Sequence, residues 1–89
     1  MKIAWQAFQK EALDSLRALV RLDTTNPPGN ERIAADYIAE ALGAHGVQSV
    51  IRESAPTRAS VVARYKGTDS SAGALLLSSH TDVVPVERS

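Results

Sequence analysis

The sequence predicts an α/β protein: a fragment of a three-layer α/β/α sandwich in which two helices precede three β-strands. Apolar residues recur at three- and four-residue steps through the first half of the chain, as in amphipathic helices. After Gly46 the pattern changes to short runs of β-branched residues separated by turn residues. The last of these runs is apolar throughout, which is typical of a central strand covered by helices on both faces.

Length and composition limit the size of the domain and the kinds of partner that we expect. A chain of 89 residues is one small domain at most, and such a domain buries only about 60–65% of the surface that its unfolded chain exposes. Ten basic and ten acidic residues give a formal net charge of zero, which predicts no attraction to nucleic acid or to an anionic membrane. No segment has the apolar core of a signal peptide or the ~20 apolar residues of a membrane span. We therefore expect a cytoplasmic protein.

The first helix is predicted over residues 3–22. Its apolar side consists of Phe8, Ala12, Leu16, Leu19 and Val20. Lys10 and Asp14, on the other side, are spaced for an ion pair along a solvated face. Trp5 and Phe8 could form a platform for stacking a ligand, but aromatic side chains more often pack in a core. We therefore assign both to the core.

A connection rich in turn residues, 23–29, separates the two helices. The residue before each proline is biased out of the helical region, and turn chemistry accounts for Asn26 and the threonines without a role in binding. Asn30 is the predicted N-cap of a second helix that ends near residues 43–46, with Gly46 in the left-handed conformation. We expect His45, at that end, to be a surface or capping residue. The predicted buried stripe of this helix is Ile33, Ala34, Tyr37, Ile38, Ala41 and Leu42.

Two strands are predicted over residues 47–53 and 59–65. The five residues between them are too few for a crossover helix, so the strands should form an antiparallel hairpin. A polar turn over residues 66–73 leads to a third strand, residues 74–78, which carries Leu75, Leu76 and Leu77 in sequence. Because both faces of that strand need cover, it belongs in the middle of a larger sheet.

His80 and Asp82 follow this third strand directly. Ligands in open α/β sheets bind beyond the carboxyl ends of the strands. Imidazole is a common zinc ligand, and its second nitrogen usually donates to a carboxylate or a carbonyl. Residues two apart on an extended segment face the same side, so Asp82 is placed to hold the ring of His80. Taken alone, the pair also fits an ordinary ion pair at a strand end.

A wider motif strengthens the metal interpretation. Residues 79–85, Ser-His-Thr-Asp-Val-Val-Pro, follow an apolar strand, and residues 25–31 read Thr-Asn-Pro-Pro-Gly-Asn-Glu. Both segments resemble the M20 family of zinc-dependent peptidases and amidohydrolases, the group of acetylornithine deacetylase, succinyl-diaminopimelate desuccinylase, aminoacylase-1 and the glutamate carboxypeptidases. The motifs occur in the family's order, and the resemblance extends over essentially the whole chain.

The resemblance implies a zinc-exopeptidase-like catalytic domain in which metal-activated water hydrolyses an amide or peptide bond. It makes His80 a ligand of one of two zinc ions, for which Co²⁺ is a potential substitute. Asp82 becomes a catalytic residue that orients His80. The implied substrate is a small peptide or an N-acylated amino acid, and the full-length enzyme could be a homodimer. Substrate-binding residues are not identifiable within these 89 residues.

The remaining ligands and the general base lie downstream in this family. We therefore expect residues 1–89 to be the N-terminal part of a longer enzyme, inactive and only weakly zinc-binding by themselves. Two alternatives stay open. One is a small interaction module without catalysis, and the other is a catalytically inactive M20-like protein used for binding.

Overall fold

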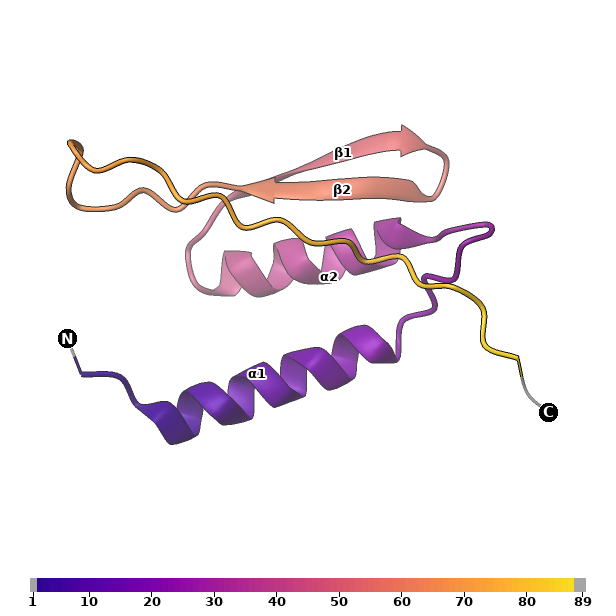
Figure 1. Ribbon diagram of the computed structural model, residues 1–89, viewed down its shortest axis with the longest axis horizontal. Helices are drawn as coiled ribbons and strands as arrows, with labels where there is room; N and C mark the ends of the chain where they lie inside the picture. Colours follow the sequence, from indigo (N-terminus) through magenta and orange to yellow (C-terminus); the bar gives the residue numbers. More distant parts are fainter. Residues whose placement is uncertain (1, 88–89) are drawn as a thin grey trace.

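The computed structural model describes residues 2–87, which form two helices followed by a two-stranded antiparallel sheet (Figure 1). The elements are α1 (Trp5–Val20), α2 (Glu31–Ala44), β1 (Ser49–Ala55) and β2 (Arg58–Ala63). This arrangement confirms a mixed α/β chain and the predicted order of its first four elements. Within residues 2–87, no helix combines the length and the hydropathy needed to cross a membrane.

Helix α1 lies on the side of α2 away from the hairpin and is two residues shorter at each end than predicted (Figure 1). The ion pair between Lys10 Nζ and Asp14 Oδ2, at 2.7 Å, is present as expected. The assignment of Trp5 and Phe8 to the core is wrong, because they are 61% and 57% exposed. Their rings pack edge to face against each other, with centroids 6.0 Å apart. The cause is tertiary: α2 packs on the hairpin, and no described strand reaches the apolar side of α1.

Helix α2 begins where the hairpin turn meets it. Asn30 occupies the predicted N-cap position, yet its side chain makes no capping hydrogen bond. The Arg32 amide instead donates to the Thr57 carbonyl at 3.0 Å, and Thr57 Oγ1 donates to the Gly29 carbonyl at 2.9 Å. The turn between the strands therefore supplies an acceptor to the first turn of the helix, where amide groups lack partners within the helix. At the other end, Gly46 has a φ of +76°, as predicted.

The buried core is small and made of small residues. Ala34 and Ala35 of α2 and Ala59 of β2 are its apolar members, and Thr24 and Glu31 are the buried polar residues among those that the structure describes. The predicted stripe of α2 is confirmed at Ala34 and wrong at Ile33, which is exposed. The other predicted members, Tyr37, Ile38, Ala41 and Leu42, are half-buried.

The hairpin is confirmed, with strand ends shifted by one or two residues from the prediction. Val50 pairs with Val62 and Ile51 with Val61, and a register irregularity lies between Glu53 and Ala55. The loop places Pro56 before Thr57, which has a φ of +68°. This order fits a type II turn, which requires a positive φ at its third residue and often has proline before it.

The third strand, predicted over residues 74–78, does not form within the described part of the chain. This segment runs past the hairpin without a ladder partner, and Leu75, Leu76 and Leu77 are 84–86% exposed (Figure 1). A strand is stabilised by hydrogen bonds to its neighbours, and a groove of about 600 Å³ separates residues 76–82 from β2. The prediction of order α-α-β-β-β therefore holds only for its first four elements.

Candidate functional site

Two segments far apart in the sequence meet at the candidate site. Thr25 and Val83 form an isolated parallel bridge. The Val83 amide donates to the Thr24 carbonyl at 3.2 Å, and the Asn26 amide donates to the Val83 carbonyl at 2.8 Å. The buried Thr24 hydroxyl donates to the Thr81 carbonyl at 2.6 Å. The loop before α2 is thereby fixed alongside the segment that carries the predicted site residues.

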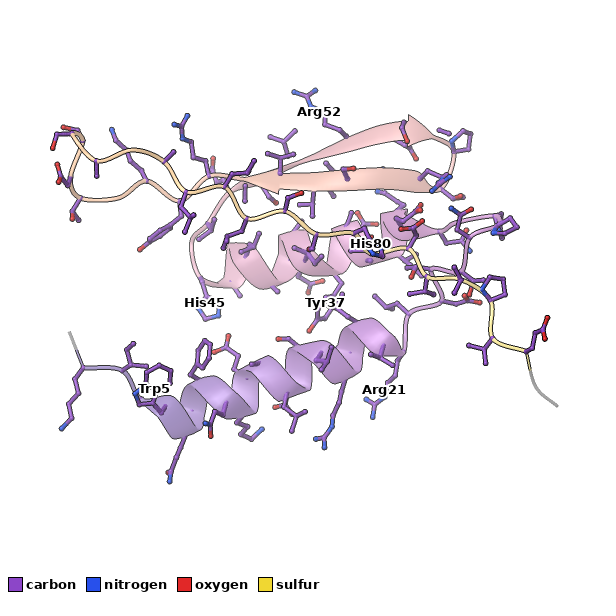
Figure 2. All side chains as sticks on the ribbon, in the orientation of Figure 1. Trp5, Arg21, Tyr37, His45, Arg52 and His80 are labelled. Atoms are coloured by element: carbon purple, nitrogen blue, oxygen red, sulfur yellow. The ribbon has the colours of Figure 1, made fainter. Side chains whose placement is uncertain are left out.

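His80 and Asp82 contact each other as predicted. His80 Nδ1 lies 3.1 Å from Asp82 Oδ1 and 2.9 Å from the Asp82 carbonyl oxygen. Both oxygens accept hydrogen bonds, so Nδ1 carries the proton and donates. In the neutral ring this leaves Nε2 with a free lone pair. The His80 side chain is 85% exposed and lies on the extended segment that passes in front of α2 (Figure 2).

The Asp82 carboxylate has a different partner on each oxygen. Oδ1 faces His80, whereas Oδ2 accepts a hydrogen bond of 3.1 Å from the side-chain amide of Asn26. Arg58 Nη2 lies 3.9 Å from the same Oδ2. The Asn26 hydrogen bond, and after it the contact with His80, lower the pKa of Asp82 against the opposing effect of desolvation. Asp82 is therefore ionised at neutral pH and supplies a fixed negative charge beside the imidazole.

Arg58 lies near two carboxylates, those of Glu31 and Asp82. Its Nη2 and Nε donate to Glu31 Oε1 and Oε2 at 2.6 and 3.1 Å, a two-point pairing of guanidinium and carboxylate. The Glu31 side chain is only 8% exposed. The hydrogen bond from Arg58 is the main reason that the pKa of Glu31 falls, and the nearby Asp82 charge opposes this shift. The pair connects the first residue of α2 to the first residue of β2 and borders the site.

The site opens onto two hollows. The larger is the groove of about 600 Å³ between β2 and residues 76–82, and its lining includes Glu31, Arg58, His80 and Asp82. A second hollow of about 370 Å³ is lined by Asn26, His80, Asp82, Val83 and Val84. His80 and Asp82 border both. Space for a ligand therefore exists in both hollows next to the imidazole.

The chain's other histidine lies away from this site. His45 follows α2 at its C-terminal end, and its Nε2 lies 2.9 Å from Glu11 Oε1 of α1 (Figure 2). The prediction of a surface or capping residue is confirmed. Its acidic partner was not foreseen, because that partner stands 34 residues earlier.

His80 can supply one ligand of a metal site. Within residues 2–87, no group of three or more His, Asp and Glu side chains is placed to hold a metal ion. His80 offers a neutral nitrogen with an open approach, and its other nitrogen is engaged as ligating histidines require. These residues therefore fit a zinc ion as the source of one ligand.

Three residues of the site were missed from the sequence: Asn26, Glu31 and Arg58. From the sequence, turn chemistry accounts for Asn26, and Glu31 offers only a negative charge next to the predicted N-cap, Asn30. The available signal was weak, since Glu31 and Arg58 are merely opposite charges 27 residues apart. Comparison of the chain with protein-family models, curated proteins and solved structures finds no match.

Proposed function

We propose that these residues are the N-terminal part of the catalytic domain of a zinc-dependent hydrolase that cleaves amide or peptide bonds. His80 is a metal ligand through Nε2, and Asp82 is the catalytic partner that orients its ring. The substrate class is a small peptide or an N-acylated amino acid, as the resemblance of residues 79–85 to the M20 family implies.

One observation carries the proposal. The proton of the neutral His80 ring is held at Nδ1 by two oxygens of Asp82, at 2.9 and 3.1 Å, which leaves the Nε2 lone pair at the surface. A metal ligand needs this arrangement, because only an unprotonated nitrogen binds the metal and an anionic partner raises the basicity of that nitrogen.

The residues of this chain have distinct tasks in such a site. Bound zinc would polarise the substrate carbonyl and lower the pKa of the attacking water. His80 would hold one metal ion in place. Asp82, kept ionised by the hydrogen bond from Asn26 and its contact with His80, would fix the ring and offset part of the positive charge. The two hollows that His80 borders leave room for substrate and for ligands from other segments.

The proposal includes completion of the sheet by further strands into a three-layer sandwich. The groove beside β2 is bordered on its other side by residues 76–82, and the three leucines next to it are exposed. A larger sheet would cover these leucines and the edge of β2. An interaction module would use the same apolar surface for a partner protein. Continuation of the reading frame past Ser89 into a second carboxylate-rich motif would favour the hydrolase.

The test uses the full-length protein with His80→Ala and Asp82→Asn. His80→Ala should lower the zinc content, measured by mass spectrometry of the purified protein, and abolish hydrolysis of a panel of dipeptides and N-acyl amino acids. Asp82→Asn should retain zinc and reduce turnover about 10- to 100-fold, since a partner that orients a metal ligand has effects of this size.

His45→Ala is the matched control. It removes the other histidine of these residues, which contacts Glu11 instead of the site, and should change neither zinc content nor rate. Unchanged zinc and turnover in both His80→Ala and Asp82→Asn would contradict the proposed function. Zinc binding without hydrolysis of any substrate in the panel would favour the inactive, binding relative.

A further inference from the structure

We propose that Asn26 is a positioning residue of this site: its side-chain amide holds the Asp82 carboxylate in the orientation that engages His80. The inference rests on the proposed function for its effect on catalysis. Its structural part, the control of the His80 tautomer, stands on the geometry of the described residues alone.

The hydrogen bonds of Asp82 show what Asn26 does. A carboxylate rotates readily about its last side-chain bond, because that torsion has no sharp staggered minima. Asn26 Nδ2 donates to Oδ2 at 3.1 Å, and this bond directs Oδ1 to His80 Nδ1, also at 3.1 Å. The carboxylate accepts hydrogen bonds only, so the amide must present its NH₂ group to it.

Arg58 is a competing partner for the Asp82 carboxylate, so the hydrogen bond from Asn26 is needed to keep that carboxylate on His80. Arg58 Nη2 already lies 3.9 Å from Asp82 Oδ2, and a modest rotation of the carboxylate would convert that approach into a direct ion pair. His80 Nδ1 would then keep only the Asp82 carbonyl as an acceptor. Arg58 is itself restrained by its two hydrogen bonds to Glu31. The hydrogen bond from Asn26 to Oδ2 therefore opposes a rotation that would draw Oδ2 to Arg58 and turn Oδ1 away from His80.

The backbone places Asn26 where it can do this. Its amide donates to the Val83 carbonyl at 2.8 Å, and the Val83 amide donates to the Thr24 carbonyl at 3.2 Å. These two bonds set residues 24–26 against residues 81–83 in a fixed register. The Asn26 side chain thus reaches Asp82 from a restrained backbone. A neutral donor also leaves the negative charge of Asp82 available to His80, which a lysine or arginine at this position would compensate.

The experiment measures the His80 tautomer in the zinc-free, full-length protein labelled with ¹⁵N-histidine. Long-range ¹H–¹⁵N spectra distinguish a protonated ring nitrogen from an unprotonated one, and His80→Gln identifies the resonances. In the native protein the neutral ring should be mainly the Nδ1–H form. In Asn26→Ala and in the nearly isosteric Asn26→Asp, the population of the Nε2–H form should rise, while the Asp82 carbonyl, 2.9 Å from Nδ1, keeps part of the ring in the Nδ1–H form. Asn26→Asp keeps the volume, removes the donor and adds a negative charge that repels the Asp82 carboxylate, so it also releases Asp82 and serves if the alanine variant fails to fold.

Asn30→Ala is the matched control, because Asn30 lies four residues further along and its side chain makes no capping hydrogen bond. It should leave the His80 tautomer unchanged. In the zinc-loaded enzyme, Asn26→Ala should lower kcat about 10-fold with KM and zinc content retained, as expected for a residue that acts through the support of a ligand.

The outcomes separate the two proposals. A tautomer shift in the Asn26 variants of a protein that neither binds zinc nor hydrolyses the panel would support the positioning role and reject the proposed function. An unchanged tautomer in folded Asn26→Ala and Asn26→Asp would overturn the positioning role, whether or not the protein is an enzyme. An equal shift in Asn30→Ala would also overturn it, since the effect would then belong to the loop as a whole.

Discussion

Arg58 binds Glu31 through two hydrogen bonds, of 2.6 Å from Nη2 to Oε1 and 3.1 Å from Nε to Oε2. This pair joins the start of β2 to the start of α2, and it buries Glu31 while leaving Arg58 partly exposed. A buried carboxylate that loses its partner is costly, whereas exposed ion pairs such as Lys10–Asp14 contribute little. The stability of the described residues should therefore depend on this pair far more than on the surface pairs.

Acid should destabilise the protein partly through Glu31. Its folded pKa lies below the ordinary value of 4.5, chiefly because of the hydrogen bond from Arg58. Stabilisation from a carboxyl with a lowered pKa is complete above the unfolded value and is lost as pH falls through the folded one. We expect urea denaturation of the full-length protein, followed by circular dichroism, to show a loss of stability that begins near pH 4.5 and continues below it.

Glu31→Gln isolates this contribution. The variant should be less stable than the native protein at pH 7 and should lose less stability on acidification. Part of the acid sensitivity should persist in it, because hydrogen bonds to local donors also lower the pKa of Asp14, Asp23, Asp69 and Asp82. If stability depends on pH in the same way in the variant and in the native protein, the Arg58–Glu31 pair contributes nothing to the acid sensitivity.

Gly29→Ala should be strongly destabilising. Gly29 has a φ of +79°, and an added Cβ would lie 2.9 Å from Arg58 Nε and 3.0 Å from Glu31 Oε1. The left-handed backbone alone costs a non-glycine residue about 1–2 kcal/mol, and displacement of the ion pair adds to this. Gly46→Ala is the control, since Gly46 has a φ of +76° and open space around its Cβ position. In denaturant titrations the Gly46 variant should lose only the free energy of unfolding that corresponds to the left-handed backbone, about 1–2 kcal/mol. Equal losses at the two sites would show that the ion pair adapts without cost.

Thr57 should tolerate glycine better than alanine. Its φ of +68° is unusual for a β-branched residue. Its hydroxyl donates to the Gly29 carbonyl at 2.9 Å, which helps to hold the turn against α2. Alanine loses that bond, worth about 0.5–1.5 kcal/mol, and keeps the backbone strain. Glycine loses the same bond but relieves strain of about 1–2 kcal/mol. Denaturant titrations should therefore rank Thr57→Gly at or above the native stability and Thr57→Ala below it, and the reverse order would contradict the strain argument.

Residues 1–89 produced alone should associate through residues 75–77. The three leucines are 84–86% exposed, and covering one such side chain is worth about 1.5–3 kcal/mol. Sedimentation velocity should show oligomers, and Leu76→Lys should increase the monomer fraction. Val20→Lys, which replaces an exposed apolar residue on α1, is the control and should have the smaller effect. A monomeric native segment with a sharp thermal transition would favour the small interaction module.

Features that depend on near neighbours in the chain are predictable from the sequence alone. Helical periodicity predicted α1 and α2 to within a few residues, and the short link through Pro56 predicted an antiparallel hairpin. Gly46 has the left-handed conformation that a helix end favours. The contact between His80 and Asp82 follows from two-residue spacing on an extended segment, which sends both side chains to one side.

Contacts between distant segments depend on the fold and are not predictable from the sequence. Asn26 meets Asp82 across 56 residues, and Arg58 meets Glu31 across 27, because the bridge at Thr25 and Val83 and the packing of the hairpin on α2 bring them together. The same dependence explains two of the errors of prediction. The apolar character of residues 75–77 and of Trp5 and Phe8 indicates a preference for burial, whereas a strand or a core also requires a neighbouring element at hydrogen-bonding or packing distance. Among residues 2–87, no element fills that place beside residues 75–77 or the apolar side of α1.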